Sequence, residues 1–102
     1  MTDDTDILRA AAVPVRVALL EMAANLTGGD RNRAYGEPVE NMAQTAAIFN
    51  ALTGHSLTAT DAATFCVALK LARLRFNPTH HDSHVDAMAY IGIRAECAGM
   101  AE

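Results

Sequence analysis

The sequence predicts an all-α protein, a small bundle of about four helices that includes an antiparallel helical hairpin. Apolar residues recur at spacings of three and four along most of the chain. Proline, glycine and capping patterns divide it into segments of helix length. No segment shows the two-residue alternation that is typical of a half-buried strand. We therefore expect a single helical domain over residues 13–102, preceded by a loose arm over residues 1–12.

Proline and glycine bound the first two predicted helices. Pro14 suits the opening of a helix over about residues 15–26, which the following threonine and two glycines end. Pro38 suits the first turn of a second helix, and Gly54 suits its C-terminal stop. Residues 28–38 are then the only long irregular stretch, and they are rich in charged side chains.

Capping patterns precede the last two predicted helices. Thr58 followed by Asp61 predicts a helix over about residues 59–76, and Ser83 followed by Asp86 predicts another over about residues 83–98. The connection between them is short, so the two helices must form an antiparallel hairpin. Large apolar side chains surround the helix over residues 59–76, more than the other helices of one small chain can cover. We therefore expect a homo-oligomer.

Composition excludes several classes of protein. The net charge of −4 argues against bulk nucleic-acid binding. No run of 18 apolar residues is present, so we expect no membrane span. The acidic N-terminal residues argue against a secretory signal, which makes the cytoplasm the expected compartment. Cys66 and Cys97 fall within helical apolar patterns and are expected to be buried free thiols.

Charged side chains are expected to meet across the hairpin. With the turn placed midway between the two helices, Arg73 lies opposite Asp86 and Lys70 lies near Tyr90. Asp82 and Asp86 are four residues apart, in line with apolar residues further along the helix, so both are predicted to point inward. Two acids and two bases would then form a partly buried seam.

Two interpretations of this seam stay open. It could be a salt-bridge latch that fixes the hairpin register, since an unpaired buried charge is strongly destabilising. It could instead be a ligand site, in which Lys70 and Arg73 bind a phosphate or Asp82 and Asp86 bind a divalent metal. Three histidines share the turn, and one of them is expected to cap the hairpin or to contact the ligand: His80, His81 and His84.

The segment before the second helix has the residue types of an anion site. Arg31 and Arg33 could bind phosphate in a forked geometry, and Tyr35 could stack on a base. Gly36 permits a positive φ or a close approach of the backbone to a ligand, and the helix beginning at Pro38 directs free N–H groups toward the segment. An ordinary loop, with its arginines paired to nearby acids, is the alternative.

Three motifs stand in order along the chain. They read R-N-R-A-Y-G-E-P-V-E-N at residues 31–41, K-L-A-R-L at residues 70–74 and H-D-S-H-V-D-A-M-A-Y at residues 81–90. In this order they resemble a family of small phage and prophage proteins defined as a domain of unknown function. The resemblance spans about residues 30–97 and implies a bacterial host. The family's recurring positions fall here on Arg31, Tyr35, Gly36, Asn41, Lys70, Arg73, Asp82, Asp86 and Tyr90.

More distantly, the helical plan is similar to MazG-like nucleotide pyrophosphohydrolases, in which acids on two helices hold Mg²⁺. Here the four metal ligands would be Glu37, Glu40, Asp82 and Asp86. Asp82 and Asp86 are four residues apart where that family has a spacing of three, and Glu37 precedes Pro38 at the edge of its helix.

Three functions are compatible with these residues. The first is a binder of a nucleotide or other phosphorylated ligand that uses no cofactor and sequesters a signalling nucleotide. Its ligand-binding residues would be Arg31, Arg33, Tyr35, Gly36, Lys70, Arg73 and Tyr90. The second is a Mg²⁺-dependent pyrophosphohydrolase, and the third is a non-catalytic interaction or inhibitor module. Under the first two, we expect the segment over residues 31–36 and the hairpin to form two walls of one site.

Overall fold

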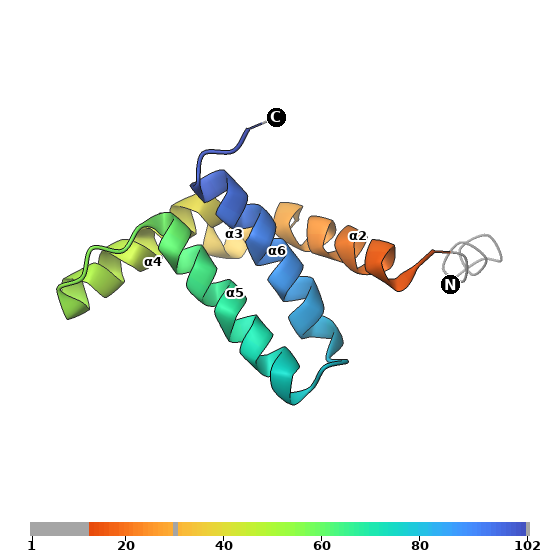
Figure 1. Cartoon of the computed structure of the whole chain (residues 1–102). Helices are drawn as coiled ribbons and strands as arrows, with labels where there is room; N and C mark the ends of the chain where they lie inside the picture. Colours follow the sequence, from red (N-terminus) through yellow and green to blue (C-terminus); the bar gives the residue numbers. More distant parts are fainter. Residues whose placement is uncertain (1–12, 30, 102) are drawn as a thin grey trace.

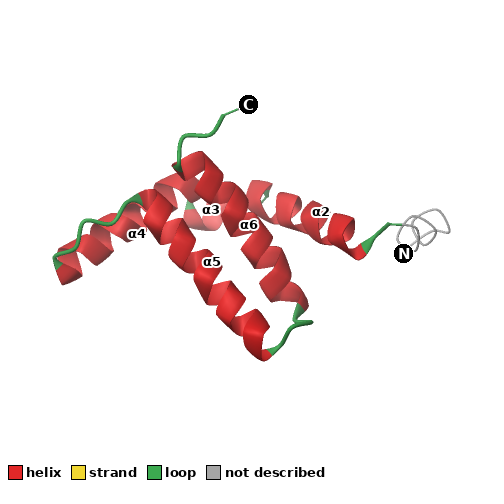
Figure 2. Cartoon of the chain, viewed as in Figure 1, coloured by secondary structure: helices red, strands yellow, loops and turns green. Residues whose placement is uncertain are grey.

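The chain folds as a set of packed helices in a computed structural model that describes residues 13–29 and 31–101 (Figure 1). The described residues contain no strand, which confirms the all-α class (Figure 2). The helices are α2 (Val15–Gly28), α3 (Arg31–Tyr35), α4 (Pro38–Thr53), α5 (Ala59–Phe76) and α6 (His81–Cys97). The predicted arm over residues 1–12 lies outside the described residues.

The antiparallel hairpin of α5 and α6 is the centre of the fold and has the most extensive helix packing. Helix α2 packs against α6, and α4 packs against the beginning of α5 and, less extensively, against α6. Figure 1 shows α2 and α4 extending away from the hairpin in opposite directions. None of the described helices is long and apolar enough to cross a membrane.

Local signals set most helix ends as predicted. Pro38 is the first residue of α4, and Gly54 ends that helix with a φ of 76°, donating its N–H to the Asn50 carbonyl. At the start of α5, the Thr58 hydroxyl accepts the Asp61 N–H, while the Asp61 carboxylate accepts the Thr58 N–H at 2.9 Å. The predicted capping box is therefore confirmed.

The capping box also makes one carboxylate sensitive to acid. Hydrogen bonds from the backbone N–H and the hydroxyl of Thr58 hold the pKa of Asp61 below its ordinary value of 3.8. Because the folded state favours the charged form, this cap stabilises the fold above about pH 4, and the contribution is lost as the pH falls through the lowered pKa.

Two local predictions were wrong. The second capping pattern does not start a helix, because α6 begins at His81 and Ser83 is buried with its hydroxyl 2.7 Å from Nδ1 of His80. The stretch over residues 28–38 is not wholly irregular, since it contains the five-residue helix α3. A helix this short has no apolar periodicity by which the sequence could reveal it.

The buried core consists mainly of small side chains. Six of the nine buried apolar residues in the described part are alanines, and the largest side chain there with less than 2% exposure is Ser83. Met42 and Ala46 of α4 pack on Ala62 and Ala63 of α5 in one cluster. A second cluster joins α2 to α6 through residues 23, 85 and 89. Alanine lets helices approach closely but removes little apolar area from water.

The large apolar side chains of α5 lie mostly outside this core. Phe65, Leu69, Leu71 and Phe76 are all exposed. The prediction that α5 carries more apolar surface than the rest of one chain covers is therefore confirmed for the described residues, while oligomerisation stays a prediction. Cys66 and Cys97 are free thiols, half-buried at the edge of the first cluster, and burial raises the pKa of the Cys97 thiol.

We predict that Thr58→Ala lowers the free energy of unfolding by about 1 kcal/mol, because the N–H of Asp61 loses its acceptor. Urea unfolding at pH 7 measures the change. Thr45→Ala is the matched control, since the Thr45 hydroxyl donates to the carbonyl and the side-chain oxygen of Asn41 within α4 and accepts no helix-capping N–H. Equal stability of the two variants would show that the cap does not support α5.

Candidate functional site

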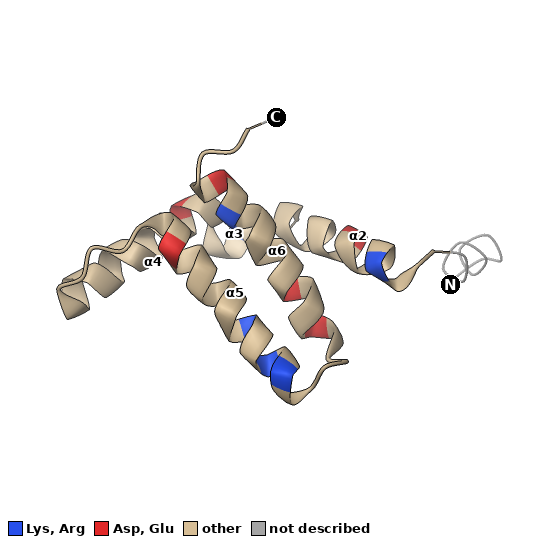
Figure 3. Cartoon of the chain, in the orientation of Figure 1, with Lys and Arg blue, Asp and Glu red and all other residues tan. Residues whose placement is uncertain are grey.

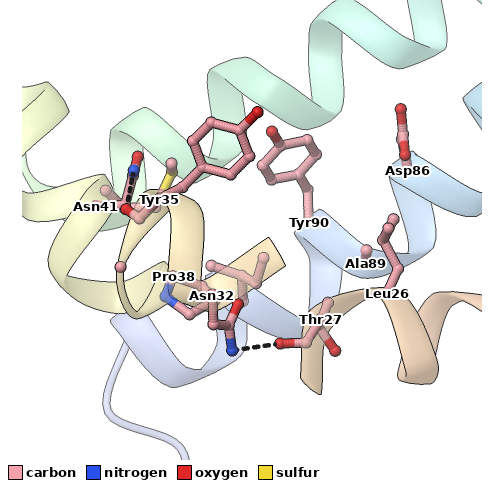
Figure 4. A pocket seen from close by; sticks show the side chains of 12 residues that line it. Leu26, Thr27, Asn32, Tyr35, Pro38, Asn41, Asp86, Ala89 and Tyr90 are labelled. Atoms are coloured by element: carbon pink, nitrogen blue, oxygen red, sulfur yellow. Dashed lines mark hydrogen bonds between the residues drawn. The ribbon is translucent and has the colours of Figure 1, made fainter. Parts of the chain in front are cut away.

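A pocket of about 260 Å³ opens where the end of α2, the short helix α3 and the start of α4 meet α6 (Figure 4). Its floor is apolar and includes Leu26, Met42, Ala89 and Ile93. Gly36 and Pro38 complete the wall at the start of α4. Six polar residues line the rest, and they come from all four helices: Thr27, Asn32, Tyr35, Asn41, Asp86 and Tyr90.

Two asparagine side chains hold α3 in place at the pocket. The side-chain amide of Asn32 donates to the Thr27 carbonyl at 2.8 Å, which joins α3 to the end of α2. The side-chain amide of Asn41 donates to the Tyr35 carbonyl at 3.1 Å, which joins α3 to α4 (Figure 4). Gly36 has a φ of 84°, so the left-handed conformation expected there is confirmed.

The pocket carries two tyrosines and one carboxylate on a common side. Tyr35 comes from the end of α3 and is exposed, whereas Tyr90 comes from the middle of α6 and is half-buried. In Figure 4 the polar ends of Tyr35, Tyr90 and Asp86 point toward the same side of the pocket. The aromatic faces can stack on a planar ligand, and the carboxylate can accept hydrogen bonds from it.

An ion pair between the two hairpin helices fixes the position of that carboxylate. Nζ of Lys70 lies 3.0 Å from Oδ2 of Asp86, and the two side chains are 14% and 23% exposed. The predicted partly buried pairing of acid and base is therefore present. Its basic member is Lys70 rather than Arg73, so the predicted register was wrong. Lys70 lies in line with the half-buried Cys66 and Leu74, whereas Arg73 shares its side of α5 with exposed residues.

Asp82 and Arg73 do not belong to this pocket. The Asp82 side chain is 86% exposed, with Nδ1 of His81 3.5 Å from its Oδ1, because it lies in the first turn of α6 near the end of the hairpin. The prediction that it points inward was wrong. Arg73 instead lines a shallow hollow with Leu69 and Phe76. Lys70 is paired with Asp86, so a phosphate site shared by Lys70 and Arg73 stays a prediction.

The histidines serve the hairpin turn. Nε2 of His84 donates to the Pro78 carbonyl at 2.8 Å, which confirms that one histidine caps the hairpin. His80 contacts the buried Ser83 hydroxyl from the N-cap position of α6. Among the described residues, no three His, Cys, Asp or Glu side chains form a group that could hold a metal ion.

The remaining predicted residues lie at or beyond the pocket rim. Arg33 is exposed on α3 and does not line the pocket, and the side chain of Arg31 lies outside the described part. Glu37 lines a separate hollow beside α2, and Glu40 is exposed in the first turn of α4. The four acids of the pyrophosphohydrolase hypothesis are therefore spread over two helix starts and the middle of α6.

Four residues of the pocket lining were predicted as site residues from the sequence: Tyr35, Gly36, Asp86 and Tyr90. Thr27 and Asn32 also line the pocket but were not predicted. These two lie where a loop was expected, and their contribution depends on α3 being helical. Asn41 entered only as a recurring position of the resembled family, with no structural role attached.

Together, the fold and the pocket define a small all-helical protein with a pocket of mixed polar and apolar lining between a helical hairpin and a short helix. The chain belongs to the family described as a domain of unknown function, DUF6378, whose model matches residues 18–98. This confirms the predicted resemblance to a phage family.

Two relatives from mycobacteriophages share most of the matched region. The chain is 33% identical over 75 residues to the Gene 55 protein of Mycobacterium phage D29, covering 74% of this chain and 50% of the relative. It is 32% identical over 78 residues to the Gene 55 protein of Mycobacterium phage L5, covering 76% and 50%. The chain thus spans about half the length of these relatives. No solved structure matches it significantly.

A double-mutant cycle tests the observed hairpin register. We predict that Lys70→Met and Asp86→Asn couple by about 1–2 kcal/mol in the free energy of unfolding, because the pair is largely shielded from water. Chemical denaturation of the two single variants and the double variant gives the coupling. Arg73→Met with Asp86→Asn is the control and should couple by less than about 0.3 kcal/mol. The opposite ranking would restore the register with Arg73 opposite Asp86.

Proposed function

We propose that this protein binds a small planar ligand of the nucleoside or nucleotide type in the pocket beside α3. One observation carries the proposal: Tyr35 and Gly36 from one motif line the same pocket as Asp86 and Tyr90 from a motif some fifty residues later. Two sequence motifs whose residue types suggested ligand binding thus contribute to the same pocket.

The residues of the pocket suit a base better than a phosphate. Tyrosine rings stack on any base, and a carboxylate accepts hydrogen bonds from exocyclic amines and ring N–H groups. Carbonyl and amide groups of the asparagines add further donors and acceptors. None of the residues that line the pocket is Lys or Arg, and the ammonium of Lys70 is paired with the Asp86 carboxylate. A phosphate would therefore lie at the mouth rather than inside.

The volume of the pocket limits the size of the ligand that it can enclose. A volume of about 260 Å³ is slightly below the roughly 300–1,000 Å³ that is usual for drug-sized ligands. A base with its sugar is compatible with that volume, whereas a dinucleotide would extend beyond it. We accordingly propose that the base enters the pocket and that phosphates contribute little to affinity.

Binding without turnover is the form of this function that the geometry favours. The Mg²⁺-dependent alternative needs acids from two helices around one ion. In the described part, Asp82 is exposed near the hairpin end while Asp86 is paired with Lys70 in the middle of the fold. Sequestration of a nucleotide needs only the pocket.

Calorimetric titration tests the proposal. The protein is titrated with bases, nucleosides and mono-, di- and cyclic nucleotides, with and without Mg²⁺. We predict binding of at least one nucleoside without Mg²⁺, and an affinity loss of about 5-fold to 150-fold in Tyr35→Ala, since stacking on an aromatic ring contributes about 1–3 kcal/mol. Phe76→Ala is the control, because Phe76 is an exposed aromatic residue outside the pocket.

Each outcome of the titration separates the hypotheses. Unchanged affinity in Tyr35→Ala would place the ligand elsewhere. Hydrolysis that requires Mg²⁺ and disappears in Glu40→Ala would support the pyrophosphohydrolase. Absence of binding by every compound, with or without the metal, would overturn the proposal and leave an interaction module.

A further inference from the structure

The outer half of α4 and the loop after it form a projection, residues 47–58, that we call the spur. In Figure 1 this end of α4 points away from the hairpin. The loop is held along the helix, because the Asn50 side chain donates to the Leu57 carbonyl and accepts the Leu57 N–H, both at 2.9 Å. Phe49 also stacks on His55, with ring centroids 6.0 Å apart. The spur is therefore internally ordered.

The surface of the spur exposes four large apolar side chains and carries no Asp, Glu, Lys or Arg. Leu52 is 80% exposed and Ile48 is 60% exposed, and Phe49 and Leu57 are exposed beside them. No Asp, Glu, Lys or Arg occurs from residue 41 to residue 60. Figure 3 shows the contrast with the hairpin and α2, which carry blue and red positions. Large apolar patches without charge mark the centre of protein interfaces.

The described residues leave most of their large apolar side chains exposed. Fifteen large hydrophobic side chains are exposed in the described part of the chain, whereas the buried apolar residues larger than alanine are Met42, Val67 and Val85. Apolar surface of this kind is stabilised when another surface covers it.

We propose that a second copy of this chain covers the spur, in a symmetric dimer that pairs spur with spur. The occupant must be present whenever the chain is folded, because the monomer encloses so little large apolar side-chain surface of its own. A second copy always meets this condition, whereas a transient partner does not. An uncharged face also suits self-association, since a two-fold contact brings each charge of a patch near its own copy. This inference is independent of what the pocket binds.

Mass and stability measurements on the full chain test the dimer. Light scattering coupled to size exclusion should give twice 10.8 kDa for the wild type, and its melting temperature should rise with protein concentration. Leu52→Asp should abolish the dimer, whether the released chain stays folded or unfolds, since it places a charge in the apolar contact. Val15→Asp is the control, because Val15 is 74% exposed on α2 and lies outside the spur.

Two results would overturn the proposal. One is a wild-type mass of a single chain at tens of micromolar together with a melting temperature that does not depend on concentration, which would assign the spur to a different partner. The other is a Leu52→Asp variant that dimerises as tightly as Val15→Asp, which would place any self-association on another face. Circular dichroism of each variant shows whether a lost dimer is accompanied by unfolding.

Discussion

The contacts between the helices of this protein are made mainly by alanine side chains, and this small-residue packing determines how the helices are held and what they leave exposed. Small side chains at the contacts let α4, α5 and α6 approach closely, but they bury little apolar area, so the core contributes less than usual to stability. Specific polar contacts then decide how the helices align. The capping box at Thr58 sets the start of α5, and the ion pair of Lys70 with Asp86 sets how α5 faces α6.

The same constraint produces both the pocket and the apolar exterior. Ala89 leaves space beside Tyr90 that a larger residue would fill, and α3 covers that space only partly, held in place by its own Asn32 and by Asn41 of α4. The large apolar side chains that a conventional core would enclose lie outside, on the spur and on the outer side of α5. The pocket and the proposed contact between copies are thus two consequences of a core built mainly from alanine.

Local chemistry determined which parts of the fold could be predicted. Pro38, Gly54 and the Thr58 capping box act within a few residues, so the bounds of α4 and α5 were predictable from sequence alone. The register of the hairpin depends on how its turn folds in three dimensions, which is why Lys70 and not Arg73 meets Asp86. Ser83 had the residue type of a cap but contacts His80 from a buried position, which only the packing of α6 against α5 determines.

Some residues of the candidate site were likewise predictable from the sequence, and others were not. Tyr35, Asp86 and Tyr90 were identifiable by residue type and spacing, whereas the asparagines that position α3 depend on a helix too short to leave a pattern. Arg73 and Asp82 were grouped with the site because the predicted hairpin register and the four-residue spacing of the acids placed them beside Asp86, yet the structure shows both on exposed surfaces. Spacing therefore identified Asp86 and Tyr90 but not the exposure of Asp82, which follows from its place in the first turn of α6.

We propose that α3 and the hairpin form one ligand site, and backbone chemical-shift mapping by NMR during titration with the tightest-binding nucleoside examines that proposal residue by residue. We expect the amide signals of Thr27, Gly36, Asn41 and Tyr90 to shift together and to saturate at one ligand concentration, while those of Ile48 and Leu52 on the spur stay in place. Shifts confined to the spur or to the hairpin end near Arg73, with the pocket amides unchanged, would contradict it.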